Sequence, residues 1–292
     1  MKINMNYNME IRNLRGCDFE RVFRGFERAF GDYEIRFDKE EVRGMLTRRG
    51  FDPELSAGAF DAEGEIVGFV FNGIGMFNDR LTAYDTGTGT APDYRGEGLA
   101  GRVFDHALGL LREAGVEQYL LEVLQNNEKA IRLYEGAGFE ITREFDCFRS
   151  SIAEVDLVTP HGGAAFEVRR IGVGEVRAAS DFCDFTPSWQ NSVQSIERGI
   201  AGLTCLGAFA DGAMAGYCVL DPATGDLTQI AVRPSMRRKG VGSLLLREAL
   251  GAMKTPFVKV LNVETGTDSL VTFLKRRNIK PATSQYEMLR RL

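Results

Sequence analysis

The chain has 292 residues, of which 44% are apolar and 26% are charged, and its net charge is −5. This length predicts two domains, and the N-terminal segment lacks the apolar core of a signal peptide, so we expect a cytoplasmic protein without a membrane span. The acidic balance argues against a nucleic-acid partner. Two histidines and five scattered cysteines argue against a metal site and against a Ser-His-Asp triad.

The first part of the chain predicts helices followed by a hairpin. Apolar residues between Phe19 and Phe30 recur at three- and four-residue spacing, which predicts helix within residues 12–50 with these side chains in the core. Residues 56–71 form two short apolar runs with a polar turn between them, which is typical of paired strands.

A glycine-rich turn at residues 88–101 is the most informative segment. Leu99, Val103 and Ala107 keep helical spacing after it, so the glycines stand where a helix begins. Unpaired amides and the positive end of the helix dipole bind phosphate oxygens there, and glycines let a ligand approach the backbone. Arg95 can add a charged contact. The turn predicts a diphosphate site.

The sequence contains an internal repeat of one unit in tandem. Three patterns recur in the same order at an offset of about 140 to 150 residues: a hairpin, a proline with an Arg/Gly-rich turn and helix, and a strand with a short helix. We therefore predict two tandem α+β domains, each a mixed and largely antiparallel sheet with helices on both faces. The expected domains are residues 1–150 and 166–292, joined by a linker over residues 151–165.

A dinucleotide site is the competing interpretation of the turn. Residues 96–101 also spell GxGxxG, and Glu122 follows about 20 residues later, as in nicotinamide and flavin sites. That motif requires its first glycine directly at the end of a strand that opens a parallel strand–helix–strand unit. A hairpin precedes this turn instead, and the second copy lacks the third glycine, so we disfavour this interpretation.

These motifs resemble the GCN5-related N-acetyltransferase (GNAT) family, whose fold is the acyl-CoA N-acyltransferase fold, in tandem. The family signature Arg/Gln-x-x-Gly-x-Gly/Ala is matched by Arg95-x-x-Gly98-x-Ala100 and by Arg237-x-x-Gly240-x-Gly242. A second family pattern is matched in the first copy by six residues: Asn127, Ala130, Leu133, Tyr134, Gly138 and Phe139.

The resemblance implies acetyl-CoA as co-substrate, bound where two parallel strands separate. The implied cofactor-binding residues are the strand end and the turn, together with the start of the later helix: Thr88, Gly89, Thr90, Arg95, Gly96, Glu97, Gly98, Leu99, Ala100, Gly101 and Asn127. Backbone of the splayed strand would pair with the pantetheine arm, and an N–H near Thr88–Thr90 would hold the carbonyl oxygen.

The resemblance also implies a general base and a general acid for direct attack by an amine. Glu122, in the strand after the long helix, would take the ammonium proton, and Tyr134 would protonate the departing thiolate. Each has a structural alternative, since Glu122 could face solvent and Tyr134 could fill the core. Asp85 is the reserve base.

The second copy lacks both groups, because Asn262 replaces Glu122 and Leu274 replaces Tyr134. We expect a catalytic first domain and a degenerate second one. The expected acceptor is a primary amine of a small molecule or peptide, favoured by the 27 acidic against 19 basic residues in positions 1–150. The alternative is a non-catalytic module that senses acyl-CoA. The protein would be a monomer or a homodimer.

Overall fold

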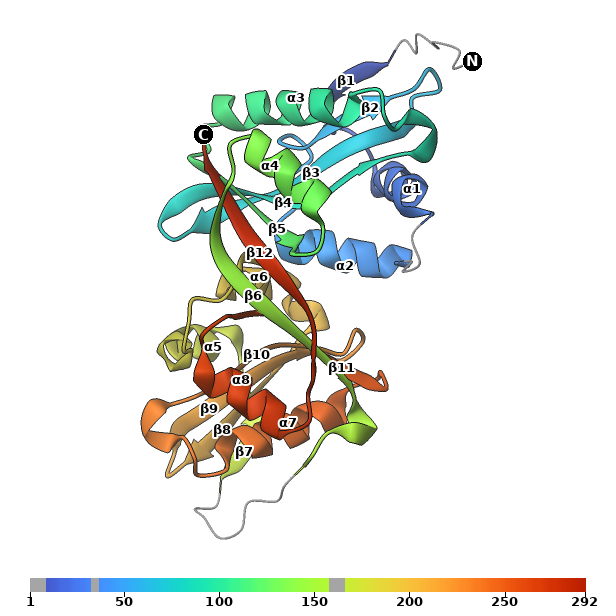
Figure 1. Ribbon diagram of the computed structural model, residues 1–292. Helices are drawn as coiled ribbons and strands as arrows, with labels where there is room; N and C mark the ends of the chain where they lie inside the picture. The colour runs from blue at the N-terminus through green and yellow to red at the C-terminus, as the bar shows by residue number, and fades with distance from the viewer. Residues whose placement is uncertain (1–8, 33–36, 158–165) are drawn as a thin grey trace. The chain divides into compact units, whose positions relative to one another are not determined.

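The structure, a computed structural model, describes residues 9–32, 37–157 and 166–292 (Figure 1). The chain divides into two compact units, and neither is one continuous stretch of sequence. Unit 1 comprises Met1–Glu122, Glu135–Glu140 and Met288–Leu292, and unit 2 comprises Val123–Tyr134 and Ile141–Glu287. Part of the expected linker forms the short helix η2 (Ile152–Glu154), and residues 158–165 lie outside the described residues.

The elements of the first copy run in the order strand, helices, three strands, helix, strand, helix and strand. They are β1 (Glu10–Asn13), α1 (Phe19–Phe30), α2 (Lys39–Arg49), β2 (Ala57–Phe60), β3 (Ile66–Phe77), β4 (Arg80–Thr90), η1 (Pro92–Tyr94), α3 (Leu99–Glu113), β5 (Gln118–Leu124), α4 (Glu128–Gly136) and β6 (Glu140–Ser151).

The second copy has the same order of strands, with additional short helices before the hairpin. Its elements are β7 (Glu167–Arg170), α5 (Val173–Ala178), η3 (Ser180–Phe182), η4 (Trp189–Asn191), α6 (Val193–Gly199), η5 (Ile200–Gly202), β8 (Thr204–Ala210), β9 (Ala213–Asp221), β10 (Asp226–Val232), η6 (Pro234–Met236), α7 (Val241–Ala252), β11 (Phe257–Glu264), α8 (Asp268–Arg276) and β12 (Pro281–Arg291).

Unit 1 is built on antiparallel strands β1 to β4, with β5 parallel to β4. Helices α1 and α2 cover one face and α3 the other (Figure 1). Asp18 begins α1 by accepting a hydrogen bond from the Arg21 amide at 2.8 Å, and the helix then buries Val22 and Phe26 against the strands. Phe26 is thus a core residue, as predicted, whereas Phe19, Phe23 and Phe30 are half-buried and pack against the same cluster.

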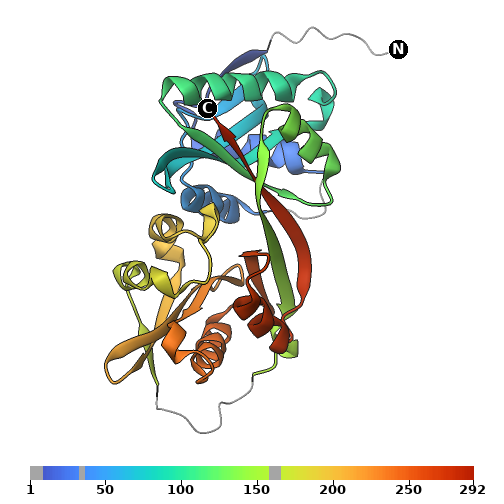
Figure 2. The ribbon, with the colours of Figure 1, turned by 60° about the vertical axis from the view of Figure 1, so that its left-hand side comes forward.

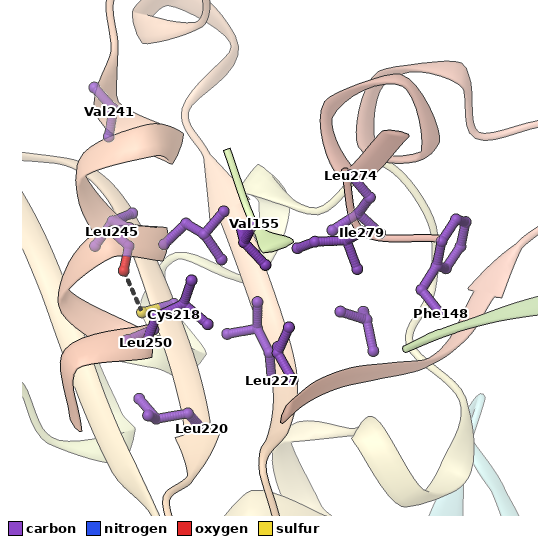
Figure 3. Close-up of a cluster of buried hydrophobic side chains, with 14 of the residues drawn as sticks. Phe148, Val155, Cys218, Leu220, Leu227, Val241, Leu245, Leu250, Leu274 and Ile279 are labelled. Carbon is purple, nitrogen blue, oxygen red and sulfur yellow. Dashed lines mark hydrogen bonds between the residues drawn. The ribbon is translucent and has the colours of Figure 1, made fainter. Parts of the chain in front are cut away.

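Two hydrophobic clusters lie among the described residues of unit 2. Helices α7 and α8 contribute to one, with Leu245 and Leu274 fully buried, and Figure 3 shows Cys218 and Leu227 from the strands packed between them. Helices α5 and α6 contribute to the other, around Tyr217. Helices therefore cover both faces of the mixed sheet, as the sequence predicted for each copy.

The C-terminal strand β12 is shared between the units. Its residues up to Glu287 belong to unit 2, where β12 neighbours β6, and β6 in turn pairs with β11. The last residues, Met288–Leu292, belong to unit 1, where the Leu292 amide donates to the Glu117 carbonyl at 3.0 Å. Figure 2 shows β12, in red, lying beside β6, in green.

The described helices are short. The longest, α3, has 15 residues, and none of the helices described is long and apolar enough to cross a membrane.

Candidate functional site

In each unit two parallel strands separate, and a bulge follows the last paired position on one of them. In unit 1, β4 pairs with β5 over Thr82–Tyr84, although β4 continues to Thr90. In unit 2, the pairing of β10 with β11 is at Asp226 and Lys259. The bulged residue is Thr86 in the first strand and Thr228 in the second, each beyond the last paired position. Backbone groups of the splayed strands are thereby available to a ligand.

The glycine-rich turn follows the splayed strand in both units. In unit 1, Gly96 and Gly98 have φ of 85° and 71°, a conformation that favours glycine, and α3 begins at Leu99. Residues Arg95–Gly98 are exposed, whereas Leu99 is 1% exposed and packs in the core. The amides at this helix start are therefore not covered by the side chains of the turn.

Arg95 anchors the turn instead of reaching out from it. Its Nε donates to the Thr90 carbonyl at 2.9 Å and its Nη2 to the Ala29 carbonyl at 2.8 Å, while the guanidinium pairs with Asp32. Arg95 also holds the pKa of the Asp32 carboxyl below its usual value through this hydrogen bond. The side chain thus ties the turn to the end of α1. The backbone amides of the turn are left as the groups predicted to bind a diphosphate.

Unit 2 repeats the bonding pattern of this anchor. The Nε of Arg237 donates to the Val232 carbonyl at 3.1 Å, its Nη2 donates to the Phe182 carbonyl at 3.2 Å, and it pairs with Asp184 at 2.7 Å. Arg238 and Gly240 have φ of 62° and 89°, so this turn has the backbone of the first turn with an arginine in place of one glycine.

A cavity of about 940 Å³ lies in unit 2 beside this turn. Its walls come from the splayed strands β10 and β11, from the turn, from α8 and from the segment around Phe185. Gln229 and Asn191 line it and cross between the strands: the Gln229 Nε2 donates to the Asn191 carbonyl at 2.6 Å, and the Asn191 Nδ2 donates to the Leu261 carbonyl at 2.8 Å. These hydrogen bonds take the place of part of the backbone ladder that β10 and β11 lack beyond Asp226, and they keep the two strands apart.

The comparison with known proteins agrees with this geometry. Residues 11–139 and 177–275 match the acetyltransferase (GNAT) family, one match to each copy. The chain belongs to the GNAT family. A tandem GNAT protein from the clavulanic acid biosynthesis pathway superposes with a TM-score of 0.72 at 16% identity, covering 97% of this chain and 98% of that one. At this identity the likeness shows the fold alone, and it confirms the predicted tandem architecture.

Curated relatives match parts of the chain. The mycothiol acetyltransferase of Thermobifida fusca is 33% identical over 143 residues, which is 46% of this chain and 44% of that protein. The streptothricin acetyltransferase of Streptomyces lavendulae is 36% identical over 81 residues, which is 28% of this chain and 42% of that protein. The chain therefore spans less than half the length of these two relatives.

In this GNAT protein, Glu122 lies on β5 of unit 1 and is half-buried. The hydroxyl of Tyr84, on β4, donates to the Glu122 Oε2 at 3.1 Å, and burial together with the Glu122 charge raises the pKa of Tyr84 well above its usual value. Arg49 lies 5.9 Å from the Tyr84 ring centre, and its Nη1 donates to the carbonyl of the bulged Thr86 at 2.9 Å. Glu122 thus belongs to a group with a phenol and a guanidinium.

The reserve base Asp85 supports the bulge. Its carboxylate accepts hydrogen bonds from the Gly87 amide at 2.9 Å and from the Thr88 hydroxyl at 2.8 Å. Gly89 marks a close approach, because a Cβ there would lie 2.8 Å from the Phe69 ring and 2.9 Å from the Ala29 Cβ. The strand end that we predicted to hold the pantetheine arm is thus fixed by its own side chains and by α1.

Tyr134 and Asn127 lie in the second unit, whereas Glu122 ends the main segment of the first. The Asn127 Oδ1 accepts from the Ala130 amide at 3.2 Å and so caps the start of α4, and Tyr134 is half-buried on that helix. The pairing of Glu122 with Tyr134 stays a prediction.

Their counterparts in the second copy are buried. The Asn262 side chain is 1% exposed and donates to the Ser188 hydroxyl at 3.1 Å, and Leu274 is fully buried in the core. Both side chains are therefore packed in the interior of the protein.

Four side chains at the two splayed strand pairs were not predicted from the sequence: Tyr84, Arg49, Gln229 and Asn191. Tyr84 and Gln229 stand within two residues of the bulge on the splayed strands, so their position on the strand before the turn is the signal that could have pointed to them. Arg49 and Asn191 come from segments far away in the sequence, and no local pattern connects them with the strands.

Proposed function

We propose that the protein is an N-acetyltransferase that moves the acetyl group of acetyl-CoA to a primary amine. The observation that carries the proposal is the arginine-anchored turn, which both units hold at the open end of a splayed strand pair. Exposed amides at a helix start suit a diphosphate, and a splayed strand offers backbone to an amide-rich arm.

The first copy, residues 1–150, is the catalytic one in this proposal. Thr88, Gly89 and Thr90 would hold the pantetheine arm and the thioester carbonyl, and the amides of Arg95–Gly101 would hold the diphosphate. Glu122 is the carboxylate next to the separated strands, and its hydrogen bond from Tyr84 fixes the orientation of the group. A fixed carboxylate is what proton abstraction from a bound ammonium requires.

The reaction is a direct attack. Glu122 removes one proton from the substrate ammonium, whose usual pKa is near 10, so that a neutral amine is formed. The nitrogen attacks the thioester carbonyl carbon, the carbon–sulfur bond breaks, and Tyr134 gives its hydroxyl proton to the leaving thiolate. The nitrogen then loses its second proton to the Tyr134 oxygen, which leaves a neutral amide and restores the hydroxyl. Backbone N–H groups near Thr88 stabilise the negative charge on the carbonyl oxygen.

The acceptor is proposed to be a small molecule or peptide that carries a primary amine. Two relatives bear the names of mycothiol and streptothricin, which favours the small-molecule alternative. The specific acceptor depends on side chains that vary among proteins of one fold.

Unit 2 is proposed to hold acyl-CoA without turnover. Its cavity and its anchored turn favour binding, while Asn262 and Leu274 supply no group that exchanges a proton near neutral pH. If both units lacked turnover, the protein would be an acyl-CoA sensor.

Release of free thiol from acetyl-CoA tests the function. With a panel of small primary amines and short peptides, we expect release that depends on both acetyl-CoA and one class of amine. Binding of acetyl-CoA by calorimetry without amine-dependent release from any member of the panel would favour the sensor. Absence of binding would overturn both alternatives.

A further inference from the structure

The cavity of unit 2 carries more positive charge than a diphosphate requires. Four basic residues line it besides the anchoring arginine, which Asp184 neutralises: Arg238, Lys239, Arg276 and Arg277. Asp268 is the other acidic residue of the lining. The amides of the turn already suit a diphosphate, so these four cations are available to a further anionic group.

Arg277 is fixed at the wall of the cavity. It ends α8, its Nη2 donates to the Ser243 hydroxyl in the first turn of α7 at 2.6 Å, and its guanidinium lies 5.7 Å from the Phe273 ring centre. Its Nε is buried and has no hydrogen-bond partner among the described residues. Phe273 also lines the cavity beside Gly242, so a planar ring and a guanidinium stand next to the glycine-rich turn of unit 2.

The other three cations are exposed at the same cavity. Arg238 and Lys239 come from the turn, and Arg276 comes from the last turn of α8. A cation in the last turn also stabilises a helix through its dipole, but Lys275 supplies that effect without lining the cavity. The helix dipole therefore does not explain why Arg276 and Arg277 face this space.

The first copy has no cation at the four corresponding positions. Gly96 and Glu97 stand where the second copy has Arg238 and Lys239, and Gly136 and Ala137 stand where it has Arg276 and Arg277. The anchoring arginines are retained, so the shared part of the turn is the part that a diphosphate needs. The additional cations belong to the second copy alone.

We infer that unit 2 contains a subsite for the 3′-phosphate of coenzyme A, built by Arg238, Lys239, Arg276 and Arg277, with Phe273 against the adenine. This inference rests on the proposed binding of acyl-CoA in unit 2 and deepens it. A phosphate monoester carries close to two negative charges at neutral pH, which suits a group of guanidinium and ammonium donors. Unit 2 therefore selects the free coenzyme over carriers that end at the pantetheine phosphate.

The test compares coenzyme A with 3′-dephospho-coenzyme A by calorimetry on the full chain. In the wild type we expect one site to bind coenzyme A at least about tenfold more tightly, as the loss of a charged contact implies. In the double variant Lys239→Glu/Arg276→Ala this ratio falls toward one. Both side chains are exposed, so the fold is retained, and Lys275→Ala is the matched control that keeps the wild-type ratio.

The outcomes separate the inference from the proposed function. Equal affinities for the two ligands at every site of the wild type overturn the subsite while leaving coenzyme binding intact. A tenfold preference that the double variant retains also overturns it, because other residues then recognise the phosphate. If neither ligand binds, the proposed function fails together with the inference.

Discussion

Glu122 accepts a hydrogen bond from a neighbouring hydroxyl on the splayed strand. The hydrogen bond from Tyr84 orients the carboxylate, and the Arg49 guanidinium lies near the Tyr84 ring. Replacement of the carboxylate by a neutral amide keeps the shape of the side chain and removes its capacity to accept a proton.

We expect Glu122→Gln to lower kcat for thiol release by about 10²- to 10⁴-fold, the usual contribution of a general base. Affinity for acetyl-CoA should stay within about twofold, since the carboxylate is not part of the anchored turn. Glu113→Gln, an exposed change at the end of α3, is the control. Unchanged kcat in Glu122→Gln would assign proton abstraction to another group.

Arg95 anchors the glycine-rich turn, whereas the sequence suggested that its side chain would contact the ligand. We expect Arg95→Ala to weaken coenzyme binding to unit 1 about tenfold or more, because a turn released from Thr90 and Ala29 no longer presents its amides in one arrangement. Calorimetry on the full chain measures this, and Arg112→Ala is an exposed control. Wild-type affinity in Arg95→Ala would show that the turn holds its shape without the anchor.

The contribution of the Arg95–Asp32 ion pair to stability depends on pH. Arg95 lowers the pKa of Asp32 in the folded state, so the pair contributes stability above the usual carboxyl pKa and loses it as the pH falls through the lowered value. Near neutral pH the anchor is therefore fully formed, and coenzyme binding to unit 1 should not weaken between about pH 6 and 8 because of this pair.

At the scale of elements, the packing of α1 against β4 depends on one glycine. A Cβ at Gly89 would approach Phe69 and Ala29 within 3 Å, whereas a Cβ at Gly87 would meet nothing within 4 Å. We expect Gly89→Ala to lower the free energy of unfolding by about 1–3 kcal/mol through overpacking. Urea unfolding measures the change, with Gly87→Ala as the matched control. Equal stability of the two variants would show that α1 moves aside without cost.

Most elements could be predicted because their signals are local. The spacing of Leu99, Val103 and Ala107 gave the start and the buried face of α3, and the repeated hairpins gave β2–β3 and β8–β9. The role of the Arg95 side chain and the contacts of Arg49 could not be predicted, since they depend on partners such as Ala29 and Thr86 that lie far away in the sequence. Local periodicity also could not show that β12 supplies residues to unit 1.

At the scale of the molecule, the end of the chain completes the first unit. Met288–Leu292 belong to unit 1, and the Leu292 amide bonds to the Glu117 carbonyl at the start of β5. We expect deletion of these five residues to raise hydrogen exchange at Gln118–Leu121 in unit 1 more than at Val258–Val260 in unit 2. Equal effects on both segments would contradict the division of the chain.

The division of β12 also bears on how such a duplicated gene can evolve. A deletion that removed the second copy would take away a strand end on which the first depends, and loss of the first copy would remove Val123–Tyr134 from the second. Loss of either copy would therefore destabilise the fold of the other, and selection against such a loss retains both copies. A copy that has lost its proton-transfer groups can persist under selection for folding alone, long enough to acquire a ligand preference of its own.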